Sequence, residues 1–385
     1  MNFLKFILYI TVFININATR EIYTFDLYEN GTCPDLIQDA ETVIGFKKCY
    51  KITNEIVTFE NDKKVKFKKE KDSLITNFAA SWGLDRINQK DLPLIREPFI
   101  NLYSGKGVKI YIIDTGVYSM HKGFNGRAET KFNFIENEKN TDLNGHGTHC
   151  AGTVGGDNYG IAKEAEIIGV KVLSKSGGGT VAGVIKGINA AIRDSKNTVA
   201  VMSLSLGGSR SEALNTAVID ASNANNIVVV AAGNSNNNAC NFSPASAGGN
   251  AKKQNSVITV MSSTITDTRS SFSNYGKCTD IIAPGSSITS YWIGSRTAIK
   301  TISGTSMATP HVAGVAALLL QKTNMNKVQT MKELFDLAAQ KKIFNVPLSS
   351  PNLLLQVPKK STVKPTTSPT KLPTKYVCSN TIKIK

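Results

Sequence analysis

The sequence predicts an α/β domain with a mostly parallel central sheet that helices cover on both faces. Two observations lead to this fold class. Short apolar runs rich in β-branched residues recur from residue 107 onward, and stretches with helical periodicity lie between them. The runs are 108–113, 166–173, 198–206, 227–232, 257–260 and 280–283, and the helical stretches are 181–194, 211–225, 307–322 and 328–340. We expect one domain of this class over residues 81–357.

The chain begins with a pattern typical of a secretory signal peptide. Within residues 1–18, Lys5 supplies a positive charge, an apolar stretch runs from Phe6 to Ile14, and Ala18 offers a cleavage point. This stretch is short for a membrane span, and no later segment reaches the length of one. We therefore expect a secreted protein without a membrane span, with a cell surface, a spore surface or a vacuole-like compartment as alternative locations.

Residues 19–80 indicate a small separate unit before the main domain. Alternation of apolar and polar residues predicts short strands at 43–46, 57–59 and 65–67, and a turn signal precedes the last of them. Cys33 and Cys49 could pair within this unit. The six cysteines of the chain include no CxxC pair, so in a secreted protein they suggest disulfides and not a zinc site.

The net charge of +16 on 385 residues raises the possibility of a nucleic-acid partner. Seven lysines lie in the acid-free tail 358–385, and segment 47–72 adds a net +4, so only +5 remains for the rest of the chain. Because the basic residues concentrate outside the predicted domain, we expect no nucleic-acid partner. The tail is rich in Pro, Lys and Thr, which predicts an extended segment, and Cys378 near its end has no obvious local partner.

A serine at the start of a predicted helix is the feature around which the chain is organised. Ser306 lies in the stretch 304–311, among small residues and just before the apolar run 312–320. A helix N-terminus offers unpaired backbone N–H groups and a positive dipole end, which suit an oxygen that becomes negative. Taken alone, the stretch is equally typical of a buried helix with an N-capping serine.

Three further polar residues follow apolar runs or glycines in the same domain. Asp114 ends one run, Asn234 follows another, and His146 lies between glycines at an expected helix start. Each has a simpler alternative, namely a capping aspartate, a polar loop residue, and a metal-binding pair of His146 with His149. Catalytic groups gather at the carboxyl ends of strands in such sheets, so we expect these residues to meet. A serine hydroxyl attacks only when an imidazole takes its proton, and a carboxylate orients that imidazole. The negative oxygen of the resulting tetrahedral intermediate would be stabilised by Asn234 and by the backbone N–H of Ser306.

Four segments of the chain closely resemble those of subtilisin-like serine proteases, peptidase family S8. They are 113–116, 144–152, 231–234 and 304–311. The resemblance is best to the proteinase K and cerevisin branch, which shares the cysteine after the second histidine, and it extends over residues 81–340. It implies a three-layer subtilisin-like fold preceded by a small α+β propeptide. It also implies a triad of Asp114, His146 and Ser306, with Asn234 in the oxyanion hole.

The resemblance further implies a secreted serine endopeptidase that works through an acyl-enzyme, needs no cofactor for catalysis and is made as a self-processing zymogen. Its substrates would be proteins and peptides. Residues 19–80 would act as its inhibitor and chaperone, and the enzyme would be a monomer. Small residues wall the implied S1 pocket, so we expect broad specificity with large apolar or aromatic P1 side chains preferred. The implied cleft residues are Leu173, Gly177, Gly178, Gly179, Ser205, Leu206, Gly207, Ala231, Ala232 and Gly233.

Two structural features also follow from the resemblance. Asp280 matches a calcium ligand of the family, so a structural Ca²⁺ is expected, although the loop 247–256 departs from the family pattern by an apparent insertion. Cys240 and Cys278 lie next to stretches that resemble family members with a disulfide at these positions.

Three alternatives stay open at this point. A catalytically inactive subtilase could serve as a coat or adhesion protein anchored by its basic tail, but all four of the implied active-site residues are present. A metalloenzyme built on His146 and His149 lacks further ligand motifs. Cys150 lies four residues after His146, on the same face of a helix, and could be the nucleophile instead. We favour Ser306, which has the helix start and the oxyanion partner.

Overall fold

The apolar runs form one central sheet in the computed structural model, which describes residues 8–16, 19–27, 56–60, 64–68, 80–95, 99, 101–249 and 257–358. From one edge to the other the strands are β16 (Ala339–Gln340), β17 (Leu353–Leu354), β13 (Ile281–Pro284), β12 (Ile258–Ser263), β10 (Ile227–Ala231), β8 (Val201–Leu204), β5 (Lys109–Asp114), β7 (Glu166–Lys171) and β6 (Ala128–Asn133). Neighbouring strands are parallel, except for β16 with β17. The prediction of a mostly parallel sheet is confirmed.

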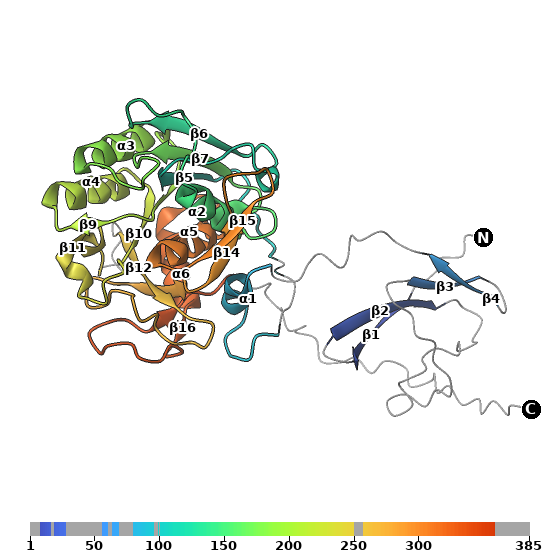
Figure 1. The fold of residues 1–385 in the computed structure, drawn as a ribbon. Coiled ribbons are helices and arrows are strands. Elements are labelled where there is room, and N and C mark those ends of the chain that lie inside the picture. Colours follow the sequence, from blue (N-terminus) through green and yellow to red (C-terminus); the bar gives the residue numbers. More distant parts are fainter. Residues whose placement is uncertain are drawn as a thin grey trace, which may run out of the picture. The chain divides into compact units, whose positions relative to one another are not determined.

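Helices cover both faces of this sheet (Figure 1). On one face lie α2 (His146–Gly155) and α5 (Thr305–Lys322), and on the other α3 (Val181–Asp194) and α4 (Glu212–Asn223). The residues of β5 alternate between the two cores: Ile110 and Ile112 pack with α2 and α5, and Tyr111 and Ile113 with α3 and α4. Successive side chains of a strand point to opposite faces, so a run that is apolar throughout requires a helical layer on each side.

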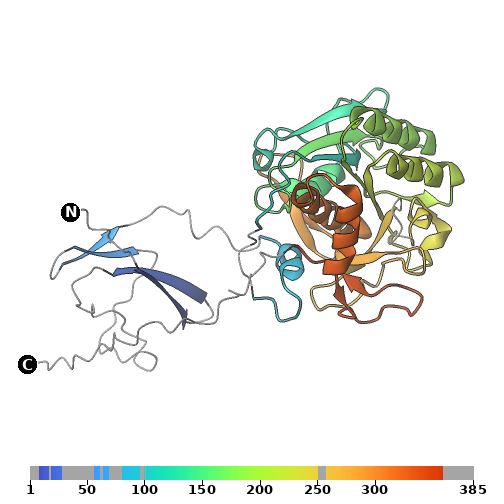
Figure 2. The same ribbon diagram turned by 180° about the vertical axis from the view of Figure 1, so that it is seen from behind.

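The four predicted helices are present, with shifts at their ends. α3 has the predicted bounds, α4 is shorter at both ends, and α5 begins two residues earlier than predicted. α6 (Lys327–Leu337), which packs beside α5 as Figure 2 shows from behind, ends before the predicted residue 340. The prediction was wrong there because Ala338 leaves the helical conformation and Ala339 pairs with Leu354 in the sheet.

Several short strands were not predicted from the sequence. β6 lies at the edge of the sheet and alternates buried with exposed residues at its start, so it lacks the continuous apolar run that marks the inner strands. Two small antiparallel pairs lie outside the main sheet, namely β14 (Ile288–Tyr291) with β15 (Ile299–Ile302), and β9 (Gly208–Ser209) with β11 (Phe242–Ser243). A further helix, α1 (Trp82–Asn88), begins after Ser81, whose side chain accepts the N–H of Gly83.

Residues 1–76 form a separate unit from residues 77–385. Its described strands make two antiparallel hairpins: β1 (Leu8–Ile16) with β2 (Thr19–Leu27), and β3 (Ile56–Glu60) with β4 (Lys64–Lys68). β3 and β4 include two of the three strands expected in this unit. The third, the Cys33–Cys49 pair and the tail beyond Pro358 with Cys378 lie outside the described residues. In the part of the chain that the structure describes, no helix is long and apolar enough to cross a membrane.

Candidate active site

The carboxylate of Asp114 and the imidazole of His146 form a direct pair. Asp114 ends β5 and is fully buried, and His146 begins α2 with its side chain 25% exposed. His146 Nδ1 lies 2.8 Å from Asp114 Oδ1 and 2.9 Å from Oδ2. Burial acts to lower the pKa of His146, but the Asp114 carboxylate, with a smaller contribution from Asp142, outweighs it and raises this pKa above its usual 6.5.

Asp142 fixes the start of the histidine helix. Its buried carboxylate accepts the backbone N–H groups of Asn144, Gly145 and Thr148, each at 2.9 Å, and the hydroxyl of Thr148 at 2.6 Å. The N-terminal N–H groups of a helix have no partner within the helix, and a carboxylate there also complements the dipole. This role of Asp142 was not predicted from the sequence, although an acidic residue shortly before a helix start is a capping signal.

Gly145, immediately before His146, meets a requirement that only glycine satisfies. Its φ is +110°, and a Cβ at this position would lie 2.3 Å from the ring of Trp292. The glycine therefore lets the chain turn into α2 while Trp292 packs directly against it. This turn sets the position from which the His146 ring enters the cleft.

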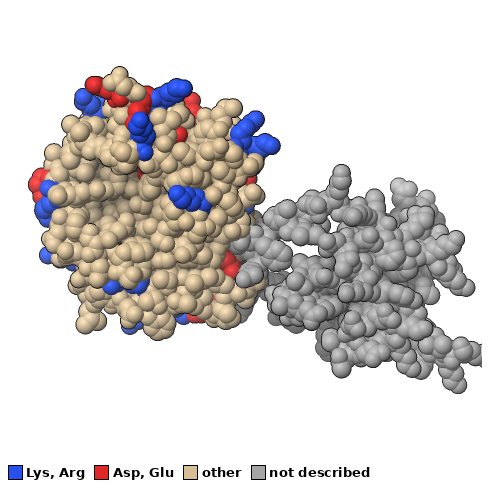
Figure 3. Space-filling model, in the orientation of Figure 1, with Lys and Arg blue, Asp and Glu red and all other residues tan. Residues whose placement is uncertain are grey.

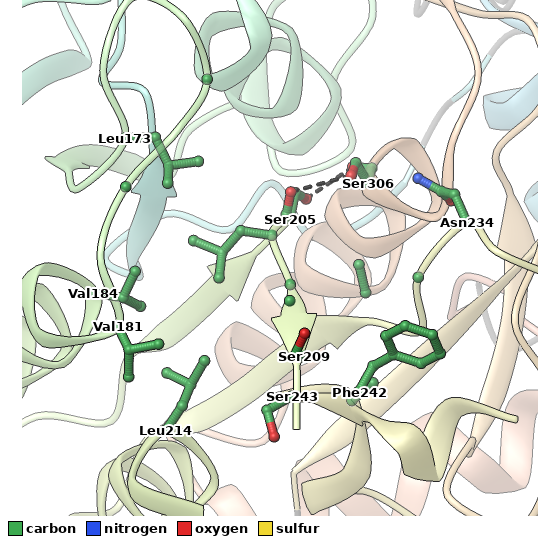
Figure 4. Close-up of a pocket in the computed structure, with 18 of the residues that line it drawn as sticks. Leu173, Val181, Val184, Ser205, Ser209, Leu214, Asn234, Phe242, Ser243 and Ser306 are labelled. Atoms are coloured by element: carbon green, nitrogen blue, oxygen red, sulfur yellow. Dashed lines mark hydrogen bonds between the residues drawn. The ribbon is translucent and has the colours of Figure 1, made fainter. Parts of the chain in front are cut away.

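Ser306 is the second residue of α5, and its side chain is held at the cleft by Ser205. The Ser306 hydroxyl donates to the carbonyl of Ser205 at 3.1 Å, and the Ser205 hydroxyl donates to the carbonyl of Ser306 at 2.8 Å (Figure 4). Ser306 and His146 line the same cavity. For the imidazole to take its proton, the Ser306 hydroxyl must leave the Ser205 carbonyl, in line with hydrogen bonds that tighten only when substrate is bound.

Asn234, just after β10, is oriented by the residue that precedes Ser306. Its side-chain oxygen accepts both the backbone N–H and the hydroxyl of Thr305, each at 2.9 Å. Because the oxygen is engaged in this way, the amide nitrogen is directed toward Ser306, as Figure 4 shows. A side-chain donor therefore lies beside the N-terminus of α5, where the orphan N–H groups of the helix also point.

His146, Asn234 and Ser306 line a cleft of about 860 Å³. All ten cleft residues named in the sequence analysis line it, with the stretch 173–179 on one side and 205–207 and 231–233 on the others. Among the described residues that line it, Arg210 is the only ionisable one apart from His146, and Arg210 pairs with Glu212. The face of the molecule seen in Figure 3 likewise carries scattered charged side chains around broad uncharged areas.

Some lining residues were missed by the sequence analysis. Val181 and Val184 of α3, Leu214 of α4 and Phe242 of β11 project into the cleft (Figure 4). The available signal in the sequence was a valine at the first residue of a predicted amphipathic helix. In the structure the side chain of this valine, Val181, is 44% exposed. Phe242 belongs to a two-residue strand that no sequence pattern marks.

The structure joins Cys240 to Cys278 by a disulfide, with 5.4 Å between their Cα atoms. Cys240 lies two residues before Phe242, so the bridge ties β11, and with it one end of the cleft, to the segment before β13.

Asp280, the implied calcium ligand, accepts the N–H of Gly249 at 3.1 and 3.0 Å and that of Thr259 at 2.8 Å. These partners are donors, and calcium needs six to eight oxygen ligands. Among the described residues no group of three acidic, His or Cys side chains surrounds Asp280.

The alternative nucleophile and the alternative metal site are both disfavoured by the geometry. Cys150 is fully buried, which raises the pKa of its thiol well above 9.0 and leaves it neutral. His149 Nε2 instead contacts the backbone carbonyls of Ile288 at 3.0 Å and Lys300 at 3.1 Å, and burial lowers the pKa of His149 to about 4. Among the described residues, the side chains close enough to share a metal ion are Asp114, His146 and Cys150, and this group does not include His149.

Comparisons with known proteins identify the family to which this chain belongs. A model of the Subtilase family matches residues 105–356. Alkaline serine exoprotease A of Vibrio alginolyticus is 49% identical over 64% of this chain and 44% of its own length. Subtilisin-like protease 2 of Pseudogymnoascus destructans is 46% identical over 69% of this chain and 63% of its own length. The chain thus spans less than two thirds of these two relatives.

A third relative and a solved structure match more completely. The extracellular serine proteinase of a Thermus species is 44% identical over 75% of this chain and 70% of its own length. The crystal structure of a cold adapted subtilisin-like serine proteinase aligns with a TM-score of 0.67 and 46% identity, over 72% of this chain and 98% of that one. These matches confirm the fold and the resemblance drawn from the four sequence segments, and the chain belongs to the Subtilase family.

Proposed function

We propose that the protein is a serine endopeptidase in which Ser306 is the nucleophile, His146 its general base and Asp114 the group that orients the imidazole. The observation that carries this proposal is the Asp114–His146 hydrogen bond beside Ser306 in one cleft. With Nδ1–H donating to Asp114, Nε2 is left to accept the Ser306 proton as the oxygen attacks the peptide carbonyl. The imidazolium then gives that proton to the leaving amine, and a water molecule hydrolyses the acyl-enzyme by the same steps.

The oxyanion of the tetrahedral intermediate would be held by the Asn234 amide and the backbone N–H of Ser306. Support comes from the Thr305 hydrogen bonds, which direct the Asn234 nitrogen toward Ser306. Donors fixed before the reaction need no reorganisation as the negative charge develops, which is why such groups lower the barrier strongly. The N-terminus of α5 adds a favourable dipole at the same point.

The substrate would bind as an added strand between residues 173–179 and 205–207, through its main chain. Recognition by backbone hydrogen bonds depends little on side chains, which favours broad specificity. The side chain at P1 would enter between Ala231, Ala232 and Gly233. Small walls leave room for large apolar or aromatic groups, and these three described residues carry no charge that would attract a charged one.

The protein is proposed to be a secreted zymogen that functions as a monomer. Residues 1–18 would be the signal peptide and residues 19–80 the inhibitor and folding aid, removed by self-cleavage near Ala80. A cut just before Ser81 would leave α1 complete with its N-cap. The similarity to the Thermus protein, an extracellular serine proteinase, supports secretion. A structural Ca²⁺ at Asp280 is part of the same proposal, and residues 250–256 lie outside the described residues.

A fluorophosphonate probe, which reacts with activated serines, tests the proposed function. Secreted wild-type protein should be labelled and should cleave a peptide amide, whereas Ser306→Ala should do neither. Cys150→Ser should keep most of both activities, because the thiol is buried and neutral. An unlabelled and inactive wild type would support the catalytically inactive subtilase, and labelling that is lost in Cys150→Ser but kept in Ser306→Ala would exclude the serine mechanism.

A further inference from the structure

A buried lysine lies between the proposed catalytic pair and the edge of the cleft. Lys171 is the last residue of β7, opposite Asp114 of β5 in the register of the sheet, and its side chain is fully buried. A buried ammonium group is unfavourable unless its three N–H groups find acceptors. Lys171 has no part in the mechanism proposed above, so its position calls for a separate explanation.

Three acceptors surround the Lys171 ammonium. Nζ donates to the carbonyl of Thr115 at 3.0 Å and to the carbonyl of Leu173 at 2.8 Å, and it lies 2.9 Å from a carboxylate oxygen of Glu138. Thr115 directly follows Asp114, and Leu173 lines the cleft. One charged group therefore fastens the segment after the proposed catalytic acid to the segment along which substrate would pair.

Glu138 carries this contact further along the cleft edge. Its two carboxylate oxygens accept the backbone N–H of Lys175 at 3.0 and 3.1 Å. The N–H of Lys175 and, to a smaller extent, the ammonium of Lys171 lower the pKa of Glu138, so the carboxylate stays charged at neutral pH. Residues on both sides of Ser174 are thus held to the same ion pair.

Thr115 continues the contact in the other direction, toward the histidine helix. Its hydroxyl donates to the Asp142 carboxylate at 2.9 Å and accepts the N–H of Gly147, next to His146, also at 2.9 Å. Asp142 in turn accepts the N–H groups at the start of α2. The hydrogen bonds therefore run without a break from the cleft edge through Lys171 and Thr115 to the helix that begins with His146.

We propose that Lys171 is a positioning residue that couples substrate pairing along residues 173–179 to the alignment of the Asp114–His146 pair. A bound peptide would fix the edge segment, and the Leu173–Lys171–Thr115 contacts would transmit this order to Asp114. This inference rests on the proposed function. Its consequence is that filling the edge raises kcat as well as lowering KM, whereas a small reagent that attacks Ser306 without filling the edge does not use the coupling.

The variant Lys171→Met, which keeps a long apolar stem and removes the charge, tests this coupling. We would measure kcat and KM for a tetrapeptide amide and for a single-residue ester with the same P1 side chain, and the rate of labelling by a small fluorophosphonate. The ratio of kcat/KM values, amide over ester, should fall about ten- to a hundredfold, with kcat carrying part of the loss. The labelling rate should stay within about threefold of wild type.

Two further variants keep the test decisive. Lys131→Met is the matched control, because Lys131 lies on the neighbouring strand β6 and pairs with Asp194 outside the cleft, so its ratio should match wild type. Glu138→Gln keeps an oxygen for the Lys175 N–H but removes the charge opposite Lys171, and it should lower the ratio in the same direction by a smaller factor. It also serves if Lys171→Met does not fold.

The outcomes separate this inference from the proposed function. An unchanged ratio in Lys171→Met and Glu138→Gln, or equal losses for amide, ester and probe, would overturn the coupling role. Equal losses would mean that Lys171 only maintains the fold. A wild-type protein that the probe fails to label would instead overturn the proposed function itself.

Discussion

His311 lies inside α5, five residues after Ser306, and is almost completely buried. Its Nδ1–H donates to the carbonyl of Met307 at 2.8 Å, whereas Nε2 has no hydrogen-bond partner among the described residues. Nε2 lies against Gly83 of α1, where a Cβ would come within 2.5 Å of it. A proton on Nε2 would create a charge without an acceptor, so burial lowers the pKa of His311 to about 4.

This lowered pKa makes the free energy of unfolding depend on pH. The unfolded histidine binds a proton near pH 6.5 and the folded one only near pH 4, so the unfolded state holds more protons between these values. The stability due to the neutral ring is complete above about pH 6.5 and is lost as the pH falls toward 4. At about 1.36 kcal/mol for each pKa unit, the difference of about 2.5 corresponds to roughly 3 kcal/mol.

Urea unfolding followed by tryptophan fluorescence measures this contribution. The Ser306→Ala protein, in which the proposed autolysis cannot occur, would be compared with the same protein carrying His311→Leu, at about pH 7.5 and about pH 4. Leucine changes the packing at both pH values. The decrease in the free energy of unfolding from about pH 7.5 to about pH 4 should nevertheless be smaller in the His311→Leu protein than in its parent, by roughly 3 kcal/mol.

A control of opposite sign is available at His146, whose folded pKa is raised. This group stabilises the fold below its unfolded pKa and loses that contribution as the pH rises through the folded value. His146→Leu in the Ser306→Ala background should therefore make the drop toward low pH larger. The reasoning on His311 is refuted if the drop is the same with and without that side chain.

Four further predictions concern the proposed mechanism, the proposed processing and the disulfide. Asn234→Ala should lower kcat about 10²–10³-fold in a peptide-amide assay, and a change in KM alone would contradict its oxyanion role. The pH–rate profile should rise through a His146 pKa above 6.5, because the imidazole must be neutral to accept a proton, and a maximum near pH 4 would exclude this. N-terminal sequencing should find secreted wild type beginning near Ser81 and Ser306→Ala uncut, whereas identical termini would indicate an outside processing enzyme. Replacing both cysteines of the disulfide, which closes a loop with a sequence separation of 38, should lower the free energy of unfolding by about 3–4 kcal/mol, and unchanged denaturant midpoints would contradict this estimate.

The inner strands and helices could be predicted because burial leaves a periodic pattern in the sequence. α3 has the predicted bounds since an amphipathic stretch follows Thr180, whose side chain caps the helix by accepting the N–H of Gly183. β6, with its alternating start, and the two-residue strands β9 and β16 carry too little of that pattern. Their conformation depends on the partner strand, which a local window does not contain.

The residues proposed to carry the chemistry were predictable for a related reason. Asp114, Asn234 and Ser306 follow apolar runs or begin a helix, so the sheet topology alone brings their segments to one edge. The exact orientation of each group was not predictable. That the Asn234 oxygen would be held by Thr305, and that the Ser306 hydroxyl would bond to Ser205, depends on segments 71 and 101 residues apart in sequence.

Buried charges mark the limit of what periodicity can reveal in this chain. Lys171 ends an apolar strand and looks like the exposed residue at which a strand stops, yet it is fully buried. The fully buried Arg86 of α1 likewise meets Asp267, 181 residues away, at 2.6 Å, and no local pattern joins the two. Each such charge is tolerated because backbone carbonyls or a carboxylate from a distant loop satisfy its donors. Removing one partner would leave the other group buried and unpaired, so each contact ties together two segments that are distant in the sequence. Arg86 lies near the start of the proposed mature chain, and Lys171 holds the carbonyl of Leu173 in the wall of the cleft.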